Sequence, residues 1–290
     1  MSEKKFQACL LSVEKMNKNR ARHTKLFGTQ TTQSRPSEVS TPAPVSSISS
    51  YSLADKIVEI YDQGEIGSCT ANAVCQAFNI VGQLQKASPA TACFAPSRLY
   101  LYYQERLMEA AAAGEGPSDL TDSGADAADG LHWIAKHGIC SEAEWPYITN
   151  LVEVAPPAPA DQSAASHKIA GIAALCPGQS APDAQTLLKA IRSTLSAGYP
   201  ILIGIQVYDS FMAAGDGNIP LPLSTETLQG GHEILLVGYN DQTETVTFAN
   251  SWGSGWGQSG LGQLPYAYVT DSTLTQEFRY FTRVVSSASA

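Results

Sequence analysis

One cysteine of this chain stands where a reactive thiol would be expected. Cys69 lies in YDQGEIGSCTANAVCQAF (61–78), directly before an apolar, helix-like run. Ser68 is a plausible N-cap, so Cys69 is expected at a helix N-terminus, where unpaired N–H groups and the helix dipole lower the pKa of a thiol. Two intervening glycines permit a tight turn that brings the Gln63 side chain toward the sulfur. The alternative is a buried structural cysteine that merely follows a turn.

A thiol nucleophile needs a base, and the five histidines are the candidates: His23, His132, His137, His167 and His232. The first four lie in a polar tail, in one predicted helix or after a Pro/Ala-rich break, and we interpret them as surface or packing residues. His232 stands in QGGHEILLVGY, where two glycines precede a strand-like run. A lone histidine there would usually be structural, so its role depends on a partner.

A partner for His232 is present in FANSWGSGWGQSG. Asn250 ends the next predicted strand, and antiparallel neighbours would bring it beside His232. An asparagine oxygen can accept one imidazole N–H and thereby fix the tautomer and the ring direction, while Trp252 could shield that bond from water. The alternative for this stretch is a glycine-rich turn with aromatic packing.

The elements that must position these residues change in type along the chain. Spacing of apolar residues and end signals predict helices, and β-branched runs predict strands, at these positions: helices 68–86, 97–110, 126–138 and 183–196, and strands 200–208, 233–241, 244–252 and 263–269. Residues 154–164, VAPPAPADQSA, are interpreted as a break. Helices first and strands later predict an α+β protein with a helical lobe, mainly 65–160, and a β-rich lobe, mainly 165–290.

The N-terminal region differs from the rest in composition and charge. Residues 1–52 form a basic extension and a Ser/Thr/Pro-rich linker, and the folded body is expected over 53–290, starting near Leu53. Residues 1–50 carry eight Lys/Arg against three Asp/Glu, a net charge of +5, whereas the remainder carries ten against twenty-four, a net charge of −14. The tail could lie on the acidic body by attraction, or it could be solvated and disordered. The acidic body argues against nucleic acid as a partner.

The composition of the chain argues against a disulfide scaffold, a metal site and a membrane span. The cysteines are too sparse for a disulfide scaffold and form no C-x-x-C pair: Cys9, Cys69, Cys75, Cys93, Cys140 and Cys176. Neither a metal nor an organic cofactor is predicted. No apolar run of about 18 residues predicts a membrane span, and no signal peptide is visible. The expectation is a soluble monomer, cytoplasmic by default, although export without a signal peptide would leave no trace in the sequence.

Three motifs in order, QGEIGSC, GGHEILLVGY and NSWGSGWG, resemble the papain family of cysteine peptidases. DGLHWIAKHGICSEAEWPY (129–147) is similar to a segment of the family's helical lobe, and the resemblance covers roughly residues 55–270. The family implies a helical lobe and a β-barrel-like lobe with the active site in the cleft between them. It also implies a nucleophile at Cys69, a base and acid at His232, an orienting amide at Asn250, and an oxyanion-binding amide at Gln63.

The resemblance also implies where substrate would bind. Ser123, Gly124 and Ala125 stand at the backbone edge that would pair with an extended peptide, and Gly231, Glu233 and Trp252 complete the predicted substrate contacts. An acid at position 233, where the family often has a small residue, would favour a basic substrate side chain. A solvent-facing glutamate is the commoner alternative.

Two departures from the family pattern change the expected scaffold. Ile66 occupies the place where many relatives have a cysteine, and Asp122 lies near its usual partner, so the family's disulfide is absent and a reducing compartment becomes credible. Thr70 follows the nucleophile where a tryptophan is common, which changes the packing behind the thiol.

These observations together predict a thiol-dependent endopeptidase that forms an acyl-enzyme on Cys69. The family's long inhibitory pro-region is not recognisable in residues 1–50, and the charge split motivates the hypothesis that a shorter basic segment crosses the cleft as an intramolecular inhibitor. The alternatives are an exopeptidase of the same family and a catalytically silent peptide-binding protein with the same fold. A transglutaminase-like acyltransferase is disfavoured, because its third catalytic residue is usually an acid.

Overall fold

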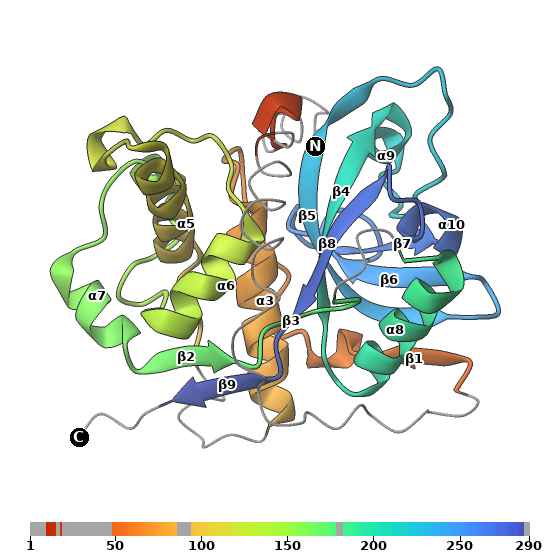
Figure 1. Ribbon diagram of the computed structural model, residues 1–290, viewed down its shortest axis with the longest axis horizontal. Coiled ribbons are helices and arrows are strands. Elements are labelled where there is room, and N and C mark those ends of the chain that lie inside the picture. The colour runs from red at the N-terminus through yellow and green to blue at the C-terminus, as the bar shows by residue number, and fades with distance from the viewer. Residues whose placement is uncertain (1–9, 16–17, 19–47, 86–93, 178–181, 287–290) are drawn as a thin grey trace.

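Two lobes meet along a central helix. The computed structural model describes residues 10–15, 18, 48–85, 94–177 and 182–286. Helices gather on one side and an antiparallel sheet on the other, with α3 (Cys69–Leu84) between them (Figure 1). Nearly every side chain of α3 is buried, as expected of a helix with neighbours on all sides. The prediction of an α+β, two-lobed fold is confirmed.

The helical lobe is built around α3, which packs against α5 and α6. Its other helices, including short 3-10 turns, are α5 (Arg98–Ala113), η2 (Pro117–Asp119), α6 (Ala127–Lys136), η3 (Thr149–Leu151) and α7 (Ala158–Ala164). Ser97 caps α5 by accepting a hydrogen bond from the Tyr100 N–H, and Gly114 ends it in the left-handed conformation. Helix α7 lies inside the segment that was expected to be a break, because proline is compatible with the first turn of a helix.

The β lobe contains a seven-stranded antiparallel sheet in the order β3-β8-β4-β5-β6-β7, with β1 paired to β5. Its strands are β1 (Ser50–Ser52), β3 (Ala173–Ala174), β4 (Ile201–Tyr208), β5 (Leu228–Asn240), β6 (Thr245–Ala249), β7 (Leu261–Pro265) and β8 (Thr275–Tyr280). The accompanying helices are η1 (Ala54–Lys56), α8 (Ala184–Ser196), α9 (Asp209–Ala213) and α10 (Tyr266–Val269). The run 263–269 was expected to be one strand, but Pro265 ends β7 and α10 begins after it.

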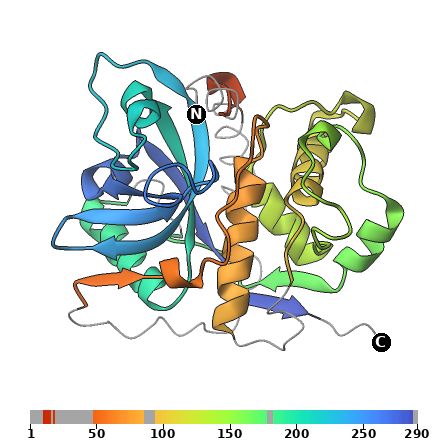
Figure 2. The ribbon, with the colours of Figure 1, turned by 180° about the vertical axis from the view of Figure 1, so that it is seen from behind.

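Both ends of the described body cross from one lobe to the other. β1 joins the sheet of the β lobe, whereas β9 (Arg283–Ser286) pairs with β2 (His167–Ala170) beneath the helices, as Figure 2 shows from behind. The Val284 side chain reaches α3 at Gly82. The two crossings tie the lobes together on the side of α3 opposite the N-terminus of that helix.

The described residues contain four free cysteines: Cys69, Cys75, Cys140 and Cys176. Cys9, Cys93 and His23 lie outside the described residues, and so does most of the expected linker, so the division at residue 52 stays a prediction. Within the described ranges no helix has both the length and the apolar character needed to cross a bilayer.

Candidate active site

Cys69 is the first residue of α3, as predicted, and its side chain is fully buried. Ser68 occupies the N-cap position but its hydroxyl makes no capping bond to the helix. The hydroxyl instead pairs with Tyr147 Oη at 2.5 Å and accepts a hydrogen bond from Asn72 Nδ2. The expected cap is therefore wrong in its contacts, because a tyrosine from a distant segment competes for the serine oxygen.

His232 and Asn250 are hydrogen-bonded across two neighbouring strands. β5 and β6 are antiparallel, and His232 Nε2 lies 2.8 Å from Asn250 Oδ1. The same Oδ1 accepts the backbone N–H of Ser251, which identifies it as the amide oxygen. Because an amide oxygen only accepts, Nε2 carries the proton and Nδ1 is left as the basic nitrogen. Trp252, 1% exposed, lies with its ring centroid 5.0 Å from that of His232, so the pair is shielded from water.

Cys69 and His232 face the same space between the lobes. α3 packs against β5. Burial raises the pKa of the Cys69 thiol, and the backbone groups of Glu233, the residue after His232, and of Thr70 act to lower it. Among the described residues, Nδ1 of His232 has no hydrogen-bond partner. The thiol and the basic nitrogen are therefore brought together from different lobes.

Gln63 is held in one orientation by the β lobe. Its Oε1 accepts a hydrogen bond from Ser251 Oγ at 2.5 Å, its Nε2 donates to the Ile66 carbonyl at 3.0 Å, and its backbone N–H donates to the Ser251 carbonyl. Since Oε1 is occupied by a donor, the amide can present only N–H groups to a ligand. Sequence reasoning missed Ser251, although it stands between the predicted residues Asn250 and Trp252.

A residue of the N-terminal segment covers Cys69. Leu11 packs against Cys69, and its N–H donates to the Gly231 carbonyl at 2.8 Å while its carbonyl accepts from the Gly231 N–H at 2.9 Å. On the other side of the cleft, a Cβ at Gly124 would lie 2.7 Å from Leu11 Cγ, so only glycine fits beneath this leucine. Leu11 thus pairs with one predicted substrate-binding residue and rests on another.

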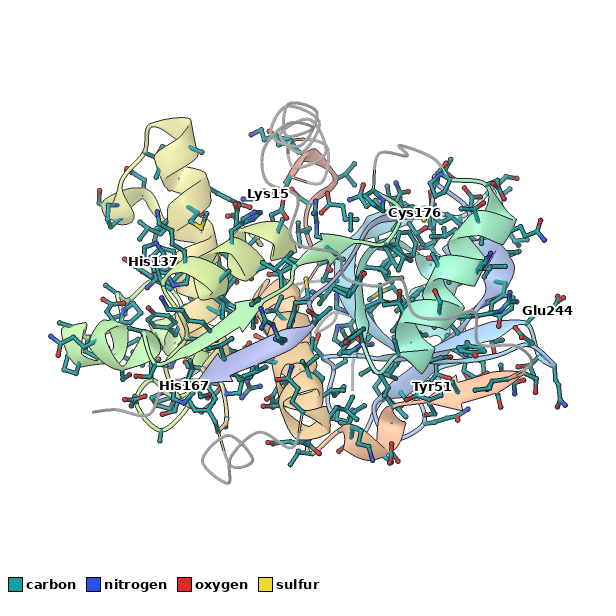
Figure 3. The ribbon with its side chains drawn as sticks, turned by 60° about the horizontal axis from the view of Figure 1, so that its bottom comes forward. Lys15, Tyr51, His137, His167, Cys176 and Glu244 are labelled. Carbon is teal, nitrogen blue, oxygen red and sulfur yellow. The ribbon has the colours of Figure 1, made fainter. Side chains whose placement is uncertain are left out.

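An ion pair holds the same segment on the helical lobe. Lys15 Nζ contacts Glu109 on α5 and lies 3.5 Å from Ser123 Oγ. Figure 1 shows the segment, coloured red, between the two lobes, and Figure 3 shows Lys15 next to the helical one. The sequence indicated attraction between a basic tail and an acidic body, but not which residues would meet.

Burial controls the ionisation of Cys69 and His232. Desolvation raises the pKa of the Cys69 thiol, and the nearby Glu233 and Glu105 carboxyls raise it further. Desolvation also lowers the pKa of His232 to about 4, although the bond to Asn250 opposes this shift. In the covered site both groups are therefore neutral at pH 7. The expected low thiol pKa is not seen here, because burial outweighs the helix dipole.

A buried carboxyl lies behind the thiol, where the resemblance led us to expect altered packing. Thr70 Oγ1 donates to Glu105 Oε2 at 2.7 Å, and Glu105 is fully buried. A Cβ at Gly130 would lie 2.2 Å from Glu105 Oε1, so α6 must carry a glycine to admit this side chain. Burial raises the pKa of Glu105, which favours its neutral form next to the thiol.

Asp122 ties the two loops that the missing disulfide would have joined. Its Oδ1 accepts the Gly67 N–H at 2.9 Å and the Tyr102 hydroxyl at 2.6 Å. Gly67 precedes the turn into α3, and a Cβ there would lie 3.0 Å from the Gly124 nitrogen. A charged acceptor thus takes the place of the covalent link between the Cys69 turn and the Gly124 loop.

Replacing Asp122 by alanine is expected to lower the free energy of unfolding by about 1 to 2 kcal/mol, because two hydrogen bonds to a charged acceptor are lost. Denaturant unfolding of both chains measures the difference. Asp55→Ala, which removes an exposed carboxylate that forms an ion pair with its neighbour Lys56, is the matched control and should change stability little. Equal effects of the two substitutions would show that Asp122 does not hold the loops.

The remaining predicted substrate-binding positions lie on both sides of the cleft. Ser123, Gly124 and Ala125 line the helical side of the cleft. Glu233 is only 7% exposed, so the solvent-facing alternative for this residue is wrong.

No cluster of three or more His, Cys, Asp or Glu within the described ranges is arranged to hold a metal ion.

The other described histidines have local contacts in the helical lobe. His132 Nδ1 lies 2.7 Å from the Ala128 carbonyl oxygen, His137 stacks on Trp133, and His167 stacks on Phe94. Figure 3 places His137 and His167 among the helices and away from the sheet that carries His232.

Comparison with known proteins agrees with this geometry. A family profile described as papain family cysteine protease matches residues 46–278. The chain is 36% identical over 220 residues to an uncharacterized peptidase C1-like protein of Acanthamoeba polyphaga mimivirus, covering 75% of this chain and 67% of that protein. It is 28% identical over 148 residues to Peptidase 1 of Psoroptes ovis, of which it spans 41%.

Solved structures show the same fold. Xylellain, a cysteine protease from Xylella fastidiosa, superposes with a TM-score of 0.72 at 31% identity, covering 86% of this chain and 90% of that one. A procathepsin B from Trypanosoma congolense superposes with a TM-score of 0.63 at 14% identity, covering 99% of this chain and 90% of that one. The chain therefore belongs to the papain family of cysteine proteases and is a peptidase of the hydrolase class.

Proposed function

We propose that this chain is a thiol-dependent endopeptidase that cleaves extended peptides through an acyl-enzyme on Cys69, and that residues 10–15 hold it in a self-inhibited state. The observation that carries the proposal is the position of Leu11. Leu11 forms an isolated antiparallel bridge with Gly231 through its own backbone, and it lies directly on Cys69. A substrate peptide would use the same backbone groups.

The chemistry follows from the protonation states that the geometry permits. Once Leu11 has left, the Cys69 proton passes to His232 Nδ1, and the thiolate attacks the carbonyl carbon of the substrate. Asn250 stabilises the imidazolium through Nε2. The imidazolium then protonates the leaving amine as the C–N bond breaks. Nδ1 then deprotonates a water molecule, which attacks the thioester carbonyl carbon. The C–S bond breaks, the carboxylic acid product leaves, and the imidazolium returns the proton to the Cys69 sulfur.

The developing oxyanion requires donors that are fixed before the reaction. Gln63 Nε2 and the backbone N–H of Cys69 are the proposed donors, and the hydrogen bond from Ser251 Oγ to Oε1 fixes the orientation of the Gln63 amide. Oxyanion donors of this kind typically contribute on the order of 3 kcal/mol to the barrier.

Labelling with an epoxysuccinyl peptide inhibitor, followed by mass spectrometry, tests the proposed nucleophile. We expect the peptide adduct on Cys69, since this thiol is uncovered when Leu11 moves away, whereas Cys75 and Cys140 are buried in the core and burial raises the pKa of both thiols. The Leu11→Asp chain is labelled in parallel, because Leu11 covers the thiol. If neither folded, reduced chain reacts at Cys69, the catalytically silent peptide-binding alternative is favoured instead.

A further inference from the structure

A buried carboxyl that the proposed mechanism does not use lies behind the nucleophile. Glu105 of α5 is fully buried, and its Oε2 accepts a hydrogen bond at 2.7 Å from the hydroxyl of Thr70, the residue after Cys69. Its Oε1 has no hydrogen-bond partner among the described residues. Burial of a carboxyl is costly, and more so when one oxygen lacks a partner, so its place beside a reactive thiol calls for an explanation.

Helix α6 is shaped to admit this side chain. A Cβ at Gly130 would lie 2.2 Å from Oε1 of Glu105, 3.1 Å from Cδ and 3.2 Å from Cγ. These close approaches run along the side chain and not only at its tip, so a larger residue on α6 would push the carboxyl away from Thr70. The carboxyl is therefore held on one side by a hydroxyl of α3 and on the other by the close approach of α6.

Further carboxyls from three elements act on Glu105. They are Glu109 on α5, Asp126 and Asp129 on α6, and Glu233 on β5. Burial is the largest cause of the raised pKa of Glu105, and the negative charges of Glu109, Asp129 and Asp126 raise it further, whereas the hydrogen bond from Thr70 acts in the opposite direction. The surroundings therefore favour a protonated Glu105.

Two cations near this group of carboxyls are directed elsewhere. Lys15 of the covering segment pairs with Glu109. Arg106, the next residue after Glu105, donates to three backbone carbonyls, those of Tyr102, Thr121 and Val152. Neither of these cations compensates a charge on Glu105, so an ionised Glu105 would add to the negative charge next to the thiol.

A small cavity beside Cys69 connects this region with the cleft. It measures about 30 Å³, enough for one water molecule, and is bordered by Thr70 and Asp126 of the helical lobe. Leu11 and His232 also border it. When Leu11 leaves, water can reach the Thr70 hydroxyl, and with it the hydrogen bond through which Glu105 exchanges its proton.

We propose that Glu105 is a positioning residue that must keep its proton for Cys69 to react, and that loss of this proton at alkaline pH inactivates the enzyme. The reactive state is the Cys69 thiolate paired with the His232 imidazolium. An ionised Glu105 places a second negative charge near the sulfur, so the proton on Nδ1 returns to Sγ and the pair becomes neutral and unreactive. The proton that Glu105 loses goes to water. This role rests on the proposed peptidase function.

The rate of Cys69 labelling by the epoxysuccinyl peptide, measured from about pH 6 to about pH 10 in the Leu11→Asp chain, tests the role. Glu105→Gln keeps the shape of the side chain and an oxygen for the Thr70 hydroxyl but cannot ionise. We expect it to label at nearly the parent rate at pH 7 and to move the midpoint of the alkaline loss upward by at least about 0.5 pH unit.

A second variant should move the same midpoint in the opposite direction. Asp129→Asn removes one of the charges that help Glu105 to keep its proton, so the alkaline loss should begin about 0.5 pH unit lower. In the Glu105→Gln/Asp129→Asn chain this downward shift should vanish, because the group that it acts on no longer ionises. A purely structural role of Glu105 would not produce opposite shifts.

Glu153→Gln, which removes an exposed carboxylate of the helical lobe, is the matched control and should leave the midpoint unchanged. If Glu105→Gln labels with the parent midpoint, the role of Glu105 is overturned, whereas the labelled Cys69 still supports the proposed nucleophile. If Glu105→Gln does not fold, Asp129→Asn decides: a downward shift supports the role and an unchanged midpoint overturns it.

Infrared spectroscopy separates this role from the proposed function if no folded chain is labelled at Cys69, a result that would contradict the function itself. A protonated carboxyl and a carboxylate absorb at different frequencies. A protonated-carboxyl band that is present at pH 7, missing from Glu105→Gln and lost at alkaline pH would support the proton on Glu105. Absence of that band at pH 7 would overturn it.

Discussion

The Leu11→Asp chain should react with an epoxysuccinyl peptide about 100-fold faster than the natural chain at pH 7. Leu11 is 8% exposed and packs on Cys69, and burial of a leucine side chain stabilises a contact by roughly 1.5 to 3 kcal/mol. An aspartate loses that contribution and would also place a carboxylate against a buried thiol, which is unfavourable. The measurement is the second-order rate constant for labelling of Cys69 in each chain.

The pH dependence of the natural chain follows from the same contact. Covering holds the pKa of His232 at about 4, whereas an exposed imidazole titrates near 6.5. Between these values the uncovered form binds more protons than the covered form, so the covered form loses stability as the pH falls from about 6.5 toward 4. The labelling rate of the natural chain should therefore approach that of Leu11→Asp over this range.

A matched control lies two residues away in the same segment. Val13 is 41% exposed, so Val13→Asp introduces the same charge without removing a contact to the thiol. It should label at nearly the natural rate. If Leu11→Asp and Val13→Asp behave alike, or if neither differs from the natural chain, residues 10–15 do not inhibit the enzyme.

The arrangement of Cys69, His232 and Asn250 could be predicted from the sequence because each part has a local cause. A glycine-containing turn before an apolar helical run places Cys69 at a helix start. Two strand-like runs that pair antiparallel bring Asn250 to His232. The periodicity of apolar residues predicted the bounds of most helices to within a few residues, since the same spacing determines which helix face is buried.

Contacts between distant segments could not be predicted in the same way. The charge split indicated that the tail and the body attract each other, but the fit of Leu11 against Gly124 depends on the shape of the closed cleft. Asp122 was noted only as standing near a missing cysteine, and its hydrogen bond to Gly67 depends on how two loops meet. Glu105 carries no local signal, because its role arises from the Thr70 hydroxyl on another helix.

Replacing His232 by alanine should lower kcat/KM by about 10⁴-fold, the largest loss expected of any single side chain other than Cys69. In the proposed mechanism the imidazole both takes the thiol proton and gives it to the leaving amine, and no other histidine within the described ranges borders the cavity beside Cys69. Assays in the Leu11→Asp background keep the covering segment from masking the loss. Peptide hydrolysis and the labelling rate are both measured.

The order of effects among neighbouring variants distinguishes a catalytic base from a packing histidine. Asn250→Ala removes the oxygen that orients the imidazole and should cost about 10- to 100-fold, whereas Gln63→Ala, which removes an oxyanion donor, should cost about 10²- to 10³-fold. His137→Ala, an exposed histidine stacked on Trp133 in the helical lobe, is the matched control and should leave activity unchanged. The unfolding transition of the His232→Ala chain shows whether it is folded. The proposed role of His232 would be contradicted if the His232→Ala chain hydrolysed peptides at nearly the rate of the His137→Ala chain. In that case the bond to Asn250 would serve only to pack β5 against β6.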